Sequence, residues 1–278
     1  MLEDRGMKRI YILFISSLLA ISAAAQDLTI LHMNDTHSHI DPERGGKNPG
    51  QGGVIEQAAF VDSVRDAVGK KNVLLVHAGD FSQGTSYFSE LNGDIEVDVL
   101  NAMQFDAVTL GNHEFDNGVD EIARRIRNLD VPVVCANYDF SGSPLEDLVQ
   151  PYVIVKKAGK KIGIIGLLTD VSTVVSKSVA DILTYMDPIE ATNKYADYLK
   201  NQKKCDFIVC LSHLGYDRGE HTDCEIAPKL RNVNVIISGH SHTKLDDLTR
   251  VKDLDGKDVI IVSDWRWGLE VGQLSIDF

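Results

Sequence analysis

The sequence lacks a surplus of basic residues and shows no compositional sign of disorder. Its 278 residues include 28 Lys and Arg against 41 Asp and Glu, so the formal charge is −13. This charge argues against binding of a nucleic-acid polymer through a basic surface, because phosphate would be repelled. Hydrophobic residues make up 44% and charged residues 25%, which excludes a disordered or collagen-like chain. An acidic protein that acts on anionic substrates needs a local positive centre, such as a metal ion.

The sequence also lacks an apolar run long enough for stable membrane insertion near its N-terminus. Residues 10–21 are apolar, whereas a bilayer-spanning helix needs roughly 20 such residues. Lys8 and Arg9 precede this run, and a small-x-small pattern follows it. These features predict a secretory signal peptide at 1–25 and a mature domain at 26–278. We therefore expect a secreted protein, periplasmic if the source is a Gram-negative bacterium.

Cysteine is scarce, with four residues and no CxxC pair, which argues against a zinc ribbon or a redox motif. An even number permits two disulfides in an oxidising compartment, with three possible connectivities. Cys135 and Cys210 lie within apolar runs and are predicted to be buried free thiols. Cys205 and Cys224 are the better candidates for a disulfide.

Short apolar runs alternate with stretches of helical periodicity along the mature chain. The predicted strands are Leu28–His32, Val73–His77, Ala107–Leu110, Val131–Cys135, Lys161–Leu167, Phe207–Leu211, Val233–Ser238, Val259–Val262 and Leu269–Ile276. Apolar residues at helical spacing predict helices over 55–68, 119–129 and 189–199. Strands that alternate with helices are typical of an α/β domain with buried sheets. Without repeats, low-complexity tracts or long linkers, the mature chain is expected to form one domain.

Polar clusters follow five of the predicted strands. They are Asn34-Asp35-Thr36-His37, Gly79-Asp80, Gly111-Asn112-His113-Glu114-Phe115-Asp116, Ser212-His213 and Gly239-His240-Ser241-His242. In open α/β sheets, sites form outside the carboxyl ends of the strands. We therefore expect these clusters to meet at one edge of the fold.

The spacing within the clusters favours a pair of metal ions. In Asp35-x-His37 and His240-x-His242, the two side chains can point the same way on an extended segment. The Asp80 carboxylate can bridge two cations with its two oxygens. Mixed Asp, His and Asn ligands suit zinc, manganese or iron rather than calcium. Two such ions, roughly 3.5–4 Å apart, clamp the attacking and leaving oxygens of a displacement at phosphorus.

The ordered set of five clusters closely resembles the calcineurin-like metallophosphoesterases. The Leu-His-x-Asn-Asp-x-His opening (residues 31–37) and Gly-Asn-His-Glu-Phe-Asp (residues 111–116) are similar to the bacterial 5′-nucleotidase and UDP-sugar hydrolase branch. The resemblance implies a four-layer αββα sandwich with two divalent metal ions. It further implies hydrolysis of nucleotide or related phosphate esters by attack of a metal-bridging hydroxide.

Carried over residue by residue, the resemblance assigns the ligands of each ion and two catalytic residues. One ion would be held by Asp35, His37, Asp80 and His242, and the other by Asp80, Asn112, His213 and His240. His113 would stabilise developing charge and assist the leaving oxygen, and Asp116 would orient it. Their spacing of three places them together on a helical turn, independently of the family. We expect Glu114 beside them to support the ligands rather than to bind metal.

The resemblance leaves the substrate open, because complete 5′-nucleotidases carry a C-terminal domain with arginines and an aromatic clamp. Nothing in this chain, which stops at Phe278, corresponds to that clamp. One alternative is a metal-domain subunit that is inactive or unselective without a separate substrate-binding partner chain. Another is a general phosphomonoesterase or cyclic phosphodiesterase.

Other histidines and aromatics are predicted to have ordinary structural roles. His32 and His77 lie within strands and are expected to be packed and hydrogen-bonded, whereas His39 and His221 are expected on surface loops. Trp265-Arg266-Trp267 is expected in a strand with cross-strand aromatic contacts. A phosphate or base platform near the site is the alternative for these three residues.

Overall fold

The fold is built on two mixed β-sheets, seen in a computed structural model that describes residues 27–173, 177 and 181–278. The predicted signal peptide lies outside the described residues. The first sheet has, in spatial order, β14 (Gly272–Ile276), β1 (Leu28–Met33), β2 (Val73–His77), β3 (Ala107–Thr109), β4 (Val133–Val134) and β6 (Val149–Gln150). Its strands run parallel except β14, which is antiparallel to β1.

The second sheet differs in having an antiparallel strand at each edge of a parallel centre. Its order is β12 (Thr249–Lys252), β13 (Asp258–Val262), β11 (Val235–Ser238), β10 (Phe207–His213), β8 (Lys160–Leu168) and β7 (Tyr152–Lys157). The edge strands β12 and β7 are the antiparallel ones. A small ribbon pairs β5 (Tyr138–Asp139) with β9 (Thr184–Tyr185).

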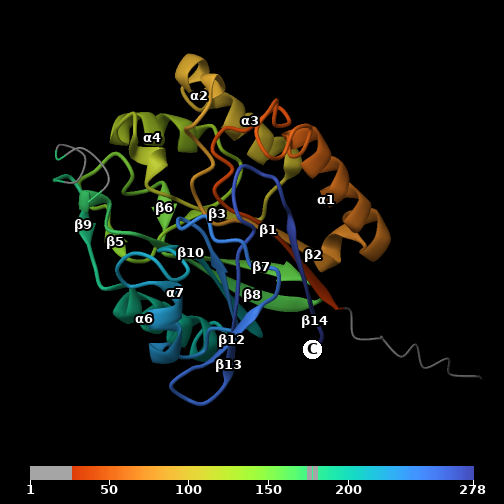
Figure 1. Cartoon of the computed structure of the whole chain (residues 1–278). Coiled ribbons are helices and arrows are strands. Elements are labelled where there is room, and N and C mark those ends of the chain that lie inside the picture. Colours follow the sequence, from red (N-terminus) through yellow and green to blue (C-terminus); the bar gives the residue numbers. More distant parts are fainter. Residues whose placement is uncertain (1–26, 174–176, 178–180) are drawn as a thin grey trace, which may run out of the picture.

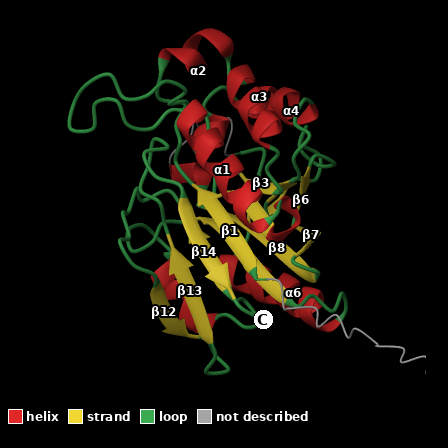
Figure 2. Cartoon of the chain, turned by 90° about the vertical axis from the view of Figure 1, so that its right-hand side faces the viewer, coloured by secondary structure: helices red, strands yellow, loops and turns green. Residues whose placement is uncertain are grey.

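Helices cover the outer faces of the two sheets (Figures 1 and 2). Those at the top of Figure 1 are α1 (Val54–Val68), α2 (Ser86–Leu91), α3 (Asp94–Met103) and α4 (Val119–Arg127). Those at the bottom are α6 (Pro188–Asn201) and α7 (Asp223–Ile226). Short 3-10 turns are η1 (Lys70–Asn72), η2 (His113–Phe115), η3 (Val171–Thr173) and η4 (Ala227–Lys229).

Three separate apolar cores show that these elements form four layers. One core lies between the first sheet and its helices, a second between the second sheet and its helices, and a third between the sheets. Because side chains alternate along a strand, β1 sends Leu31 to the outer core and Ile30 to the inner one. Likewise β8 sends Ile165 outward and Ile164 inward. The predicted αββα sandwich is therefore confirmed.

The backbones of the two sheets are in direct contact at Gly166 in β8. A Cβ built on Gly166 would lie 2.0 Å from the carbonyl oxygen of Val134 in β4 and 2.7 Å from Oγ1 of Thr109 in β3. The carbonyl of Gly166 also accepts a hydrogen bond of 2.8 Å from the amide of Ala136. Only glycine permits this backbone contact, which fixes the distance between the two sheets.

The strands and helices predicted from the sequence are present, with shorter ends in places. The strand predicted at 131–135 shrinks to Val133–Val134, and α2 and α3 were not predicted. Their boundary is hidden in the sequence because Gly93, in the left-handed region with φ 86°, separates two short helices. Among the described residues, no helix combines the length and hydrophobicity needed to cross a membrane.

The four cysteines are free thiols, so the suggested pairing of Cys205 with Cys224 is wrong. Cys205 precedes β10 and Cys224 lies in α7 beyond the other end of that strand, so the length of β10 separates them. Cys135 and Cys210 are buried, as predicted, and burial raises the pKa of the Cys135 thiol to about 12.

Candidate metal centre

The candidate metal ligands lie where the parallel strands of both sheets end. Asp35 and His37 follow β1, Asp80 follows β2, and Asn112 follows β3. In the second sheet, His213 ends β10, and His240 and His242 follow β11. The sandwich thus brings the carboxyl ends of two sheets to a common edge, as expected for an α/β fold.

Two groups of side chains are close enough to hold one ion each. Asp35, His37 and His242 form one group, and Asp80, His213 and His240 form the other. Within each group, the ligand atoms lie within 4.8 Å of one another. Each group combines residues of both sheets, so neither sheet alone could form it.

Asp80 lies between the two groups. Its Oδ2 is 3.0 Å from Nε2 of His213 and 3.7 Å from Nε2 of His37, while its Oδ1 accepts a hydrogen bond of 2.9 Å from the amide of His113. Gly111 makes room for this carboxylate, since a Cβ there would lie 2.2 Å from Oδ1. Oδ2 of Asp80 therefore lies near a histidine of each group, and bridging of two ions by this carboxylate stays a prediction.

The charges of the second group are strongly coupled. Burial opposes ionisation of Asp80, but the neighbouring His213 imidazolium holds the pKa of this carboxyl far below its usual range. Burial also disfavours a charged His213, yet Asp80 raises the pKa of His213 to about 10. Burial lowers the pKa of His240 to about 4, so its ring is neutral near pH 7 and suited to a metal. In this group a divalent cation would take the place of the proton between Asp80 and His213.

Further contacts fit the site to two ions. Nε2 of His37 lies only 2.9 Å from Nε2 of His242, and both rings belong to the group that contains the fully buried Asp35. The Oδ1 atom of Asn112 is buried without a hydrogen-bond partner among the described residues. A buried polar atom without a partner is costly, and a metal ion would satisfy it.

Five of the seven candidate ligands have left-handed backbone conformations. Positive φ angles of 48–71° occur at Asp35, His37, Asp80, His240 and His242. Such conformations cost on the order of 1–3 kcal/mol each for residues other than glycine, and they concentrate at functional sites. These left-handed conformations direct the ligand side chains of successive loops into one small volume, and they lower the stability of the fold.

Hydrogen bonds from Asn34 and His240 hold the loop that carries Asp35. The carboxylate of Asp35 accepts hydrogen bonds from the amide of His240 and from the side chain of Asn34. Asn34 also donates to the carbonyl of Trp265 and accepts from the amide of Asp264. Sequence reasoning missed this role of Asn34, although its place inside the motif of residues 31–37 was a signal for it.

Glu114 supports the ligand loops, as predicted from its position. Its buried carboxylate accepts hydrogen bonds from the amides of Asp80, Ser82 and Gly111, at 2.6–3.0 Å. Arg125 closes the network by donating to the hydroxyl of Ser82 and the carbonyl of Glu114. The loops after β2 and β3 are therefore tied together by a group that does not face the candidate ions.

His113 and Asp116 form the predicted pair on a single turn, η2. Nδ1 of His113 lies 2.9 Å from Oδ2 of Asp116, and this hydrogen bond raises the pKa of His113. The side chain of His113 is 33% exposed, and its ring centroid is 5.4 Å from that of His37. With Nδ1 bonded to the carboxylate, Nε2 is left as the proton-exchanging atom at the mouth of the site.

The histidines outside the site have the predicted roles in most cases. His32 is buried and paired with Asp264 at 2.6 Å, and His77 is buried with its Nε2 3.1 Å from Oγ1 of Thr36. Burial lowers the pKa of His77 to about 3, so this ring is neutral. His221 lies on a loop as expected. His39 also lies on a loop and is partly exposed, and its ring stacks on Trp267 with centroids 4.8 Å apart.

The predicted strand at Trp265-Arg266-Trp267 is wrong, because these residues form a loop against the site. The amide of Trp267 donates to the carbonyl of Asp35 at 2.6 Å, and the amide of Trp265 donates to the carbonyl of Thr243. These bonds tie the loop to ligand-bearing segments of both sheets. The following strand, β14, begins only at Gly272.

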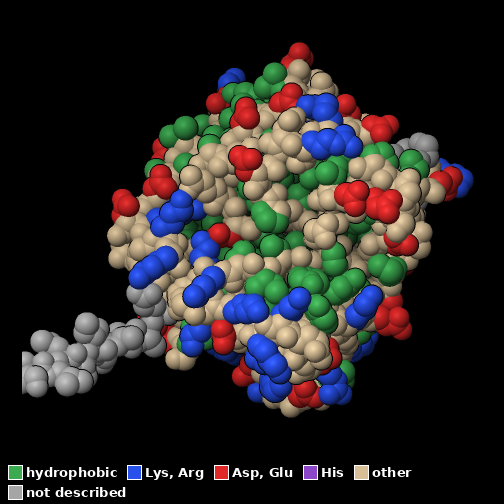
Figure 3. Space-filling view, turned by 180° about the vertical axis from the view of Figure 1, so that it is seen from behind, with side chains coloured by type: hydrophobic (Ala, Val, Ile, Leu, Met, Phe, Trp, Pro, Cys, Tyr) green, Lys and Arg blue, Asp and Glu red, His purple; other side chains and the backbone are tan. Residues whose placement is uncertain are grey.

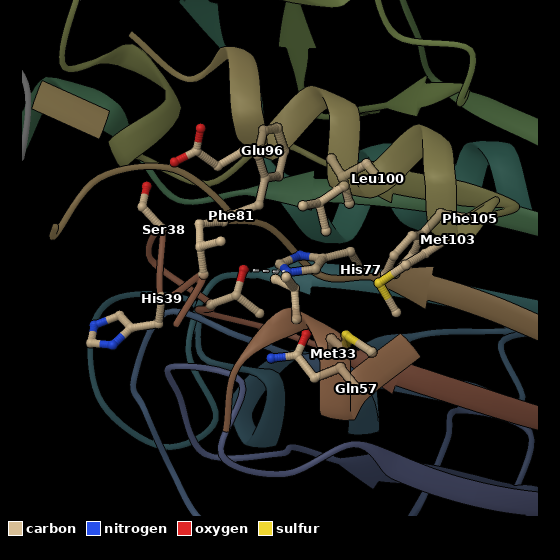
Figure 4. Close-up of a pocket in the computed structure, with 14 residues that line it drawn as sticks. Met33, Ser38, His39, Gln57, His77, Phe81, Glu96, Leu100, Met103 and Phe105 are labelled. Carbon is tan, nitrogen blue, oxygen red and sulfur yellow. Dashed lines mark hydrogen bonds between the residues drawn. The ribbon is translucent and has the colours of Figure 1, made fainter. Parts of the chain in front are cut away.

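A small enclosed cavity lies beside the ligand loops, under α3 (Figure 4). Figure 4 shows the carboxylate of Glu96 near the hydroxyl of Ser38 at one side, and Leu100, Met103 and Phe105 near His77 at the other. The cavity measures about 30 Å³, room for about one water molecule. A cavity of this size is too small for a nucleotide, and none of the seven candidate ligands lines it.

Charge is distributed unevenly over the molecule. Figure 3 shows Lys and Arg side chains gathered on the lower part of one face, and no described histidine is visible there. On β7 and β8, Lys156 faces Lys161 and Lys157 faces Lys160 across the strand pair.

Comparison with protein families matches residues 28–244 to the calcineurin-like phosphoesterases. The chain therefore belongs to this family, whose members use a dinuclear metal centre. A probable 5′-nucleotidase of Treponema pallidum is 34% identical over 282 residues, covering 91% of this chain and 45% of that protein. The NAD 5′-nucleotidase of Haemophilus influenzae is also 34% identical, over 91% of this chain and 45% of its own length.

Solved structures agree with the sequence comparison. A 5′-nucleotidase precursor from Thermus thermophilus superposes with a TM-score of 0.82 and 36% identity, covering 91% of this chain and 51% of that one. The chain thus spans about half the length of the relatives it matches. What the comparisons support directly is a 5′-nucleotidase-like metallophosphoesterase domain.

Proposed function

We propose that this domain hydrolyses phosphate esters of nucleotides, as a metal-dependent 5′-nucleotidase-like enzyme. The observation that carries the proposal is the arrangement of two ligand groups around Asp80, with the His113–Asp116 pair beside them. A single ion site would fit many metalloproteins, whereas two sites around a shared carboxylate suit displacement at phosphorus. The 5′-nucleotidase names of the relatives support nucleotides as the substrate class.

Each residue of the site receives a role in this proposal. Asp35, His37 and His242 hold one ion, Asn112, His213 and His240 hold the other, and Asp80 contributes to both. The mixed nitrogen and oxygen donors favour zinc, manganese or iron. When bound, such ions polarise the phosphoryl oxygens and supply the nucleophile.

His113 acts on the leaving group in this scheme. Asp116 holds Nδ1 of His113, so Nε2 carries the proton that is delivered to the leaving oxygen. The hydrogen bond to Asp116 raises the pKa of His113, which keeps this proton available near neutral pH. A positioned proton donor contributes about 10²–10⁴-fold to a rate.

A substrate panel tests the proposal on the purified protein. We expect hydrolysis of nucleoside 5′-monophosphates in the presence of manganese or zinc, and loss of that activity with a chelator. Nucleotide sugars, cyclic nucleotides and a generic aryl phosphate complete the panel. If the aryl phosphate is hydrolysed and no nucleotide is, the protein is an unselective phosphomonoesterase. If activity appears only after a second chain is added, the domain is a dependent subunit. Either result would overturn the proposal.

We also propose that the protein is exported, on the basis of the N-terminal sequence alone. Lys8, Arg9 and the apolar residues 10–21 support a cleaved leader. Cell fractionation followed by mass spectrometry of the N-terminus tests this, with a mature chain starting at Gln26 as the expected result. An intact N-terminus in the cytoplasmic fraction would refute it.

A further inference from the structure

The Trp265–Arg266–Trp267 loop has a strained backbone conformation. Trp265 has φ 70° and Trp267 has φ 62°, both in the left-handed region that bulky residues rarely adopt. Hydrogen bonds to the loop from Asn34, and from the loop to Asp35 and Thr243, hold this conformation. Strain of this kind persists where the surrounding structure enforces it, and it points to a function for the side chains it presents.

The strained backbone presents an arginine stacked on aromatic rings. The guanidinium carbon of Arg266 lies 4.0 Å from the ring centroid of Trp267 and 5.8 Å from that of Trp265. Stacking on indole holds a guanidinium in place without neutralising its charge. All three residues are partly exposed.

Arg266 has no carboxylate partner among the residues that the structure describes. Its Nε atom is buried and makes no hydrogen bond with a described residue. By contrast, Arg124 pairs with Asp94 and Glu121, and Arg231 pairs with Asp255. In a chain with a net charge of −13, an immobilised and unpaired guanidinium beside the site is available for an external anion.

The loop borders the candidate metal centre. Trp267 is bonded to Asp35, and Trp265 to the residue that follows His242. Trp267 also stacks on His39, two residues after His37. A substrate whose phosphoryl group lies at the metal centre therefore extends along this loop when the rest of the molecule points toward Trp265–Trp267.

We propose that Arg266 binds a second anionic group of the substrate, distinct from the phosphoryl group that is cleaved. The favoured class is then a nucleotide with two phosphates, such as a nucleoside diphosphate, over a nucleotide with one. This inference rests on the proposed function, because it assumes that the phosphoryl group is cleaved at the metal centre. Arg266 is thus a specificity-determining residue, and the indole rings position it.

Kinetics of Arg266→Gln on matched substrates test the proposal. We expect kcat/KM for a nucleoside 5′-diphosphate to fall about tenfold or more, as for loss of a charge-assisted hydrogen bond. The value for the corresponding monophosphate should change by less than about twofold. Arg266→Lys should restore part of the loss, since it keeps the charge but not the planar stack. Arg250→Gln, on the outer strand β12, is the matched control and should leave both substrates unchanged.

Tryptophan fluorescence gives a second measurement that does not depend on turnover. Trp265 and Trp267 are the only tryptophans in the chain, so their emission reports on this loop alone. With zinc present, a nucleoside diphosphate analogue with a methylene bridge should change the emission of the wild type. Arg266→Gln should need about tenfold more analogue for the same change.

Three outcomes would overturn the inference. They are an equal loss of kcat/KM on both substrates, no loss on the diphosphate, and identical fluorescence titrations of the wild type and Arg266→Gln. Failure of the proposed function is distinguishable, because the wild type would then hydrolyse neither nucleotide. The fluorescence titration would still decide whether Arg266 binds the second anionic group.

Discussion

Replacement of Gly166 by alanine tests whether contact between the sheets sets both stability and the metal centre. The new Cβ would lie 2.0 Å from the carbonyl oxygen of Val134, whereas real Cβ contacts are essentially never under 3.0 Å. The sheets must therefore separate locally by at least about 1 Å, because the obstructing atoms belong to backbone and cannot rotate away.

The cost of this separation is large compared with the stability of an ordinary domain. Overpacking of a core costs typically 1–3 kcal/mol, and a clash with backbone belongs at or above the upper end. We expect the free energy of unfolding of Gly166→Ala to fall by about 3 kcal/mol, out of a typical total of roughly 5–15 kcal/mol. Gly45→Ala is the matched control, since no atom lies within 4 Å of its added Cβ.

The same displacement should weaken metal binding. Asp80 comes from the first sheet, and His213 and His240 come from the second. A shift of about 1 Å exceeds the roughly 0.2 Å within which metal–ligand distances are held. Urea unfolding followed by circular dichroism, together with zinc titration, measures both effects. An unfolding free energy within about 1 kcal/mol of the wild type would refute the reasoning.

Four other predictions concern the site itself. His113→Ala should retain metal but lose about 10²–10⁴-fold in turnover, and loss of both metals on elemental analysis would contradict its role. Asp80→Ala should lose metal from both groups, so one fully retained ion would count against a shared carboxylate. Asp116 raises the pKa of His113, and Asp116→Asn should therefore shift the alkaline limb of the pH–rate profile to lower pH. If the alkaline limb of the profile does not move, Asp116 has no role in setting the protonation of His113. His242→Gly should bind metal more weakly, yet raise the unfolding free energy of the chelated protein by up to about 1 kcal/mol, because φ at this residue is 50°. A lower unfolding free energy would show that its side-chain contacts outweigh the backbone strain.

The sequence predicted most of the fold because its strands are buried on both faces. Runs such as Val73–Val76 and Phe207–Leu211 are apolar throughout, and a polar residue follows each of them directly. That pattern places the chemistry at the carboxyl ends of strands, where the two ligand groups are found. The roles of the individual ligands stay predictions.

Features that depend on distant contacts could not be predicted. Trp265 and Trp267 favour strands by their intrinsic preference, but hydrogen bonds to Asn34 and Asp35 impose left-handed conformations on them. The same contacts place Trp267 where it stacks on the ring of His39, a contact that the sequence does not reveal. The hydrogen bond from the amide of His113 to Oδ1 of Asp80 is likewise one that no local pattern reveals.

The division of each ligand group between the two sheets bears on the order in which the protein is made. The emerging N-terminal half carries Asp35 and Asp80, but the histidines that complete their groups are synthesised only at residues 213–242. A partly made chain thus offers acidic side chains before the rest of each ligand group exists. Both groups are complete only once residue 242 has been made and the two sheets have docked.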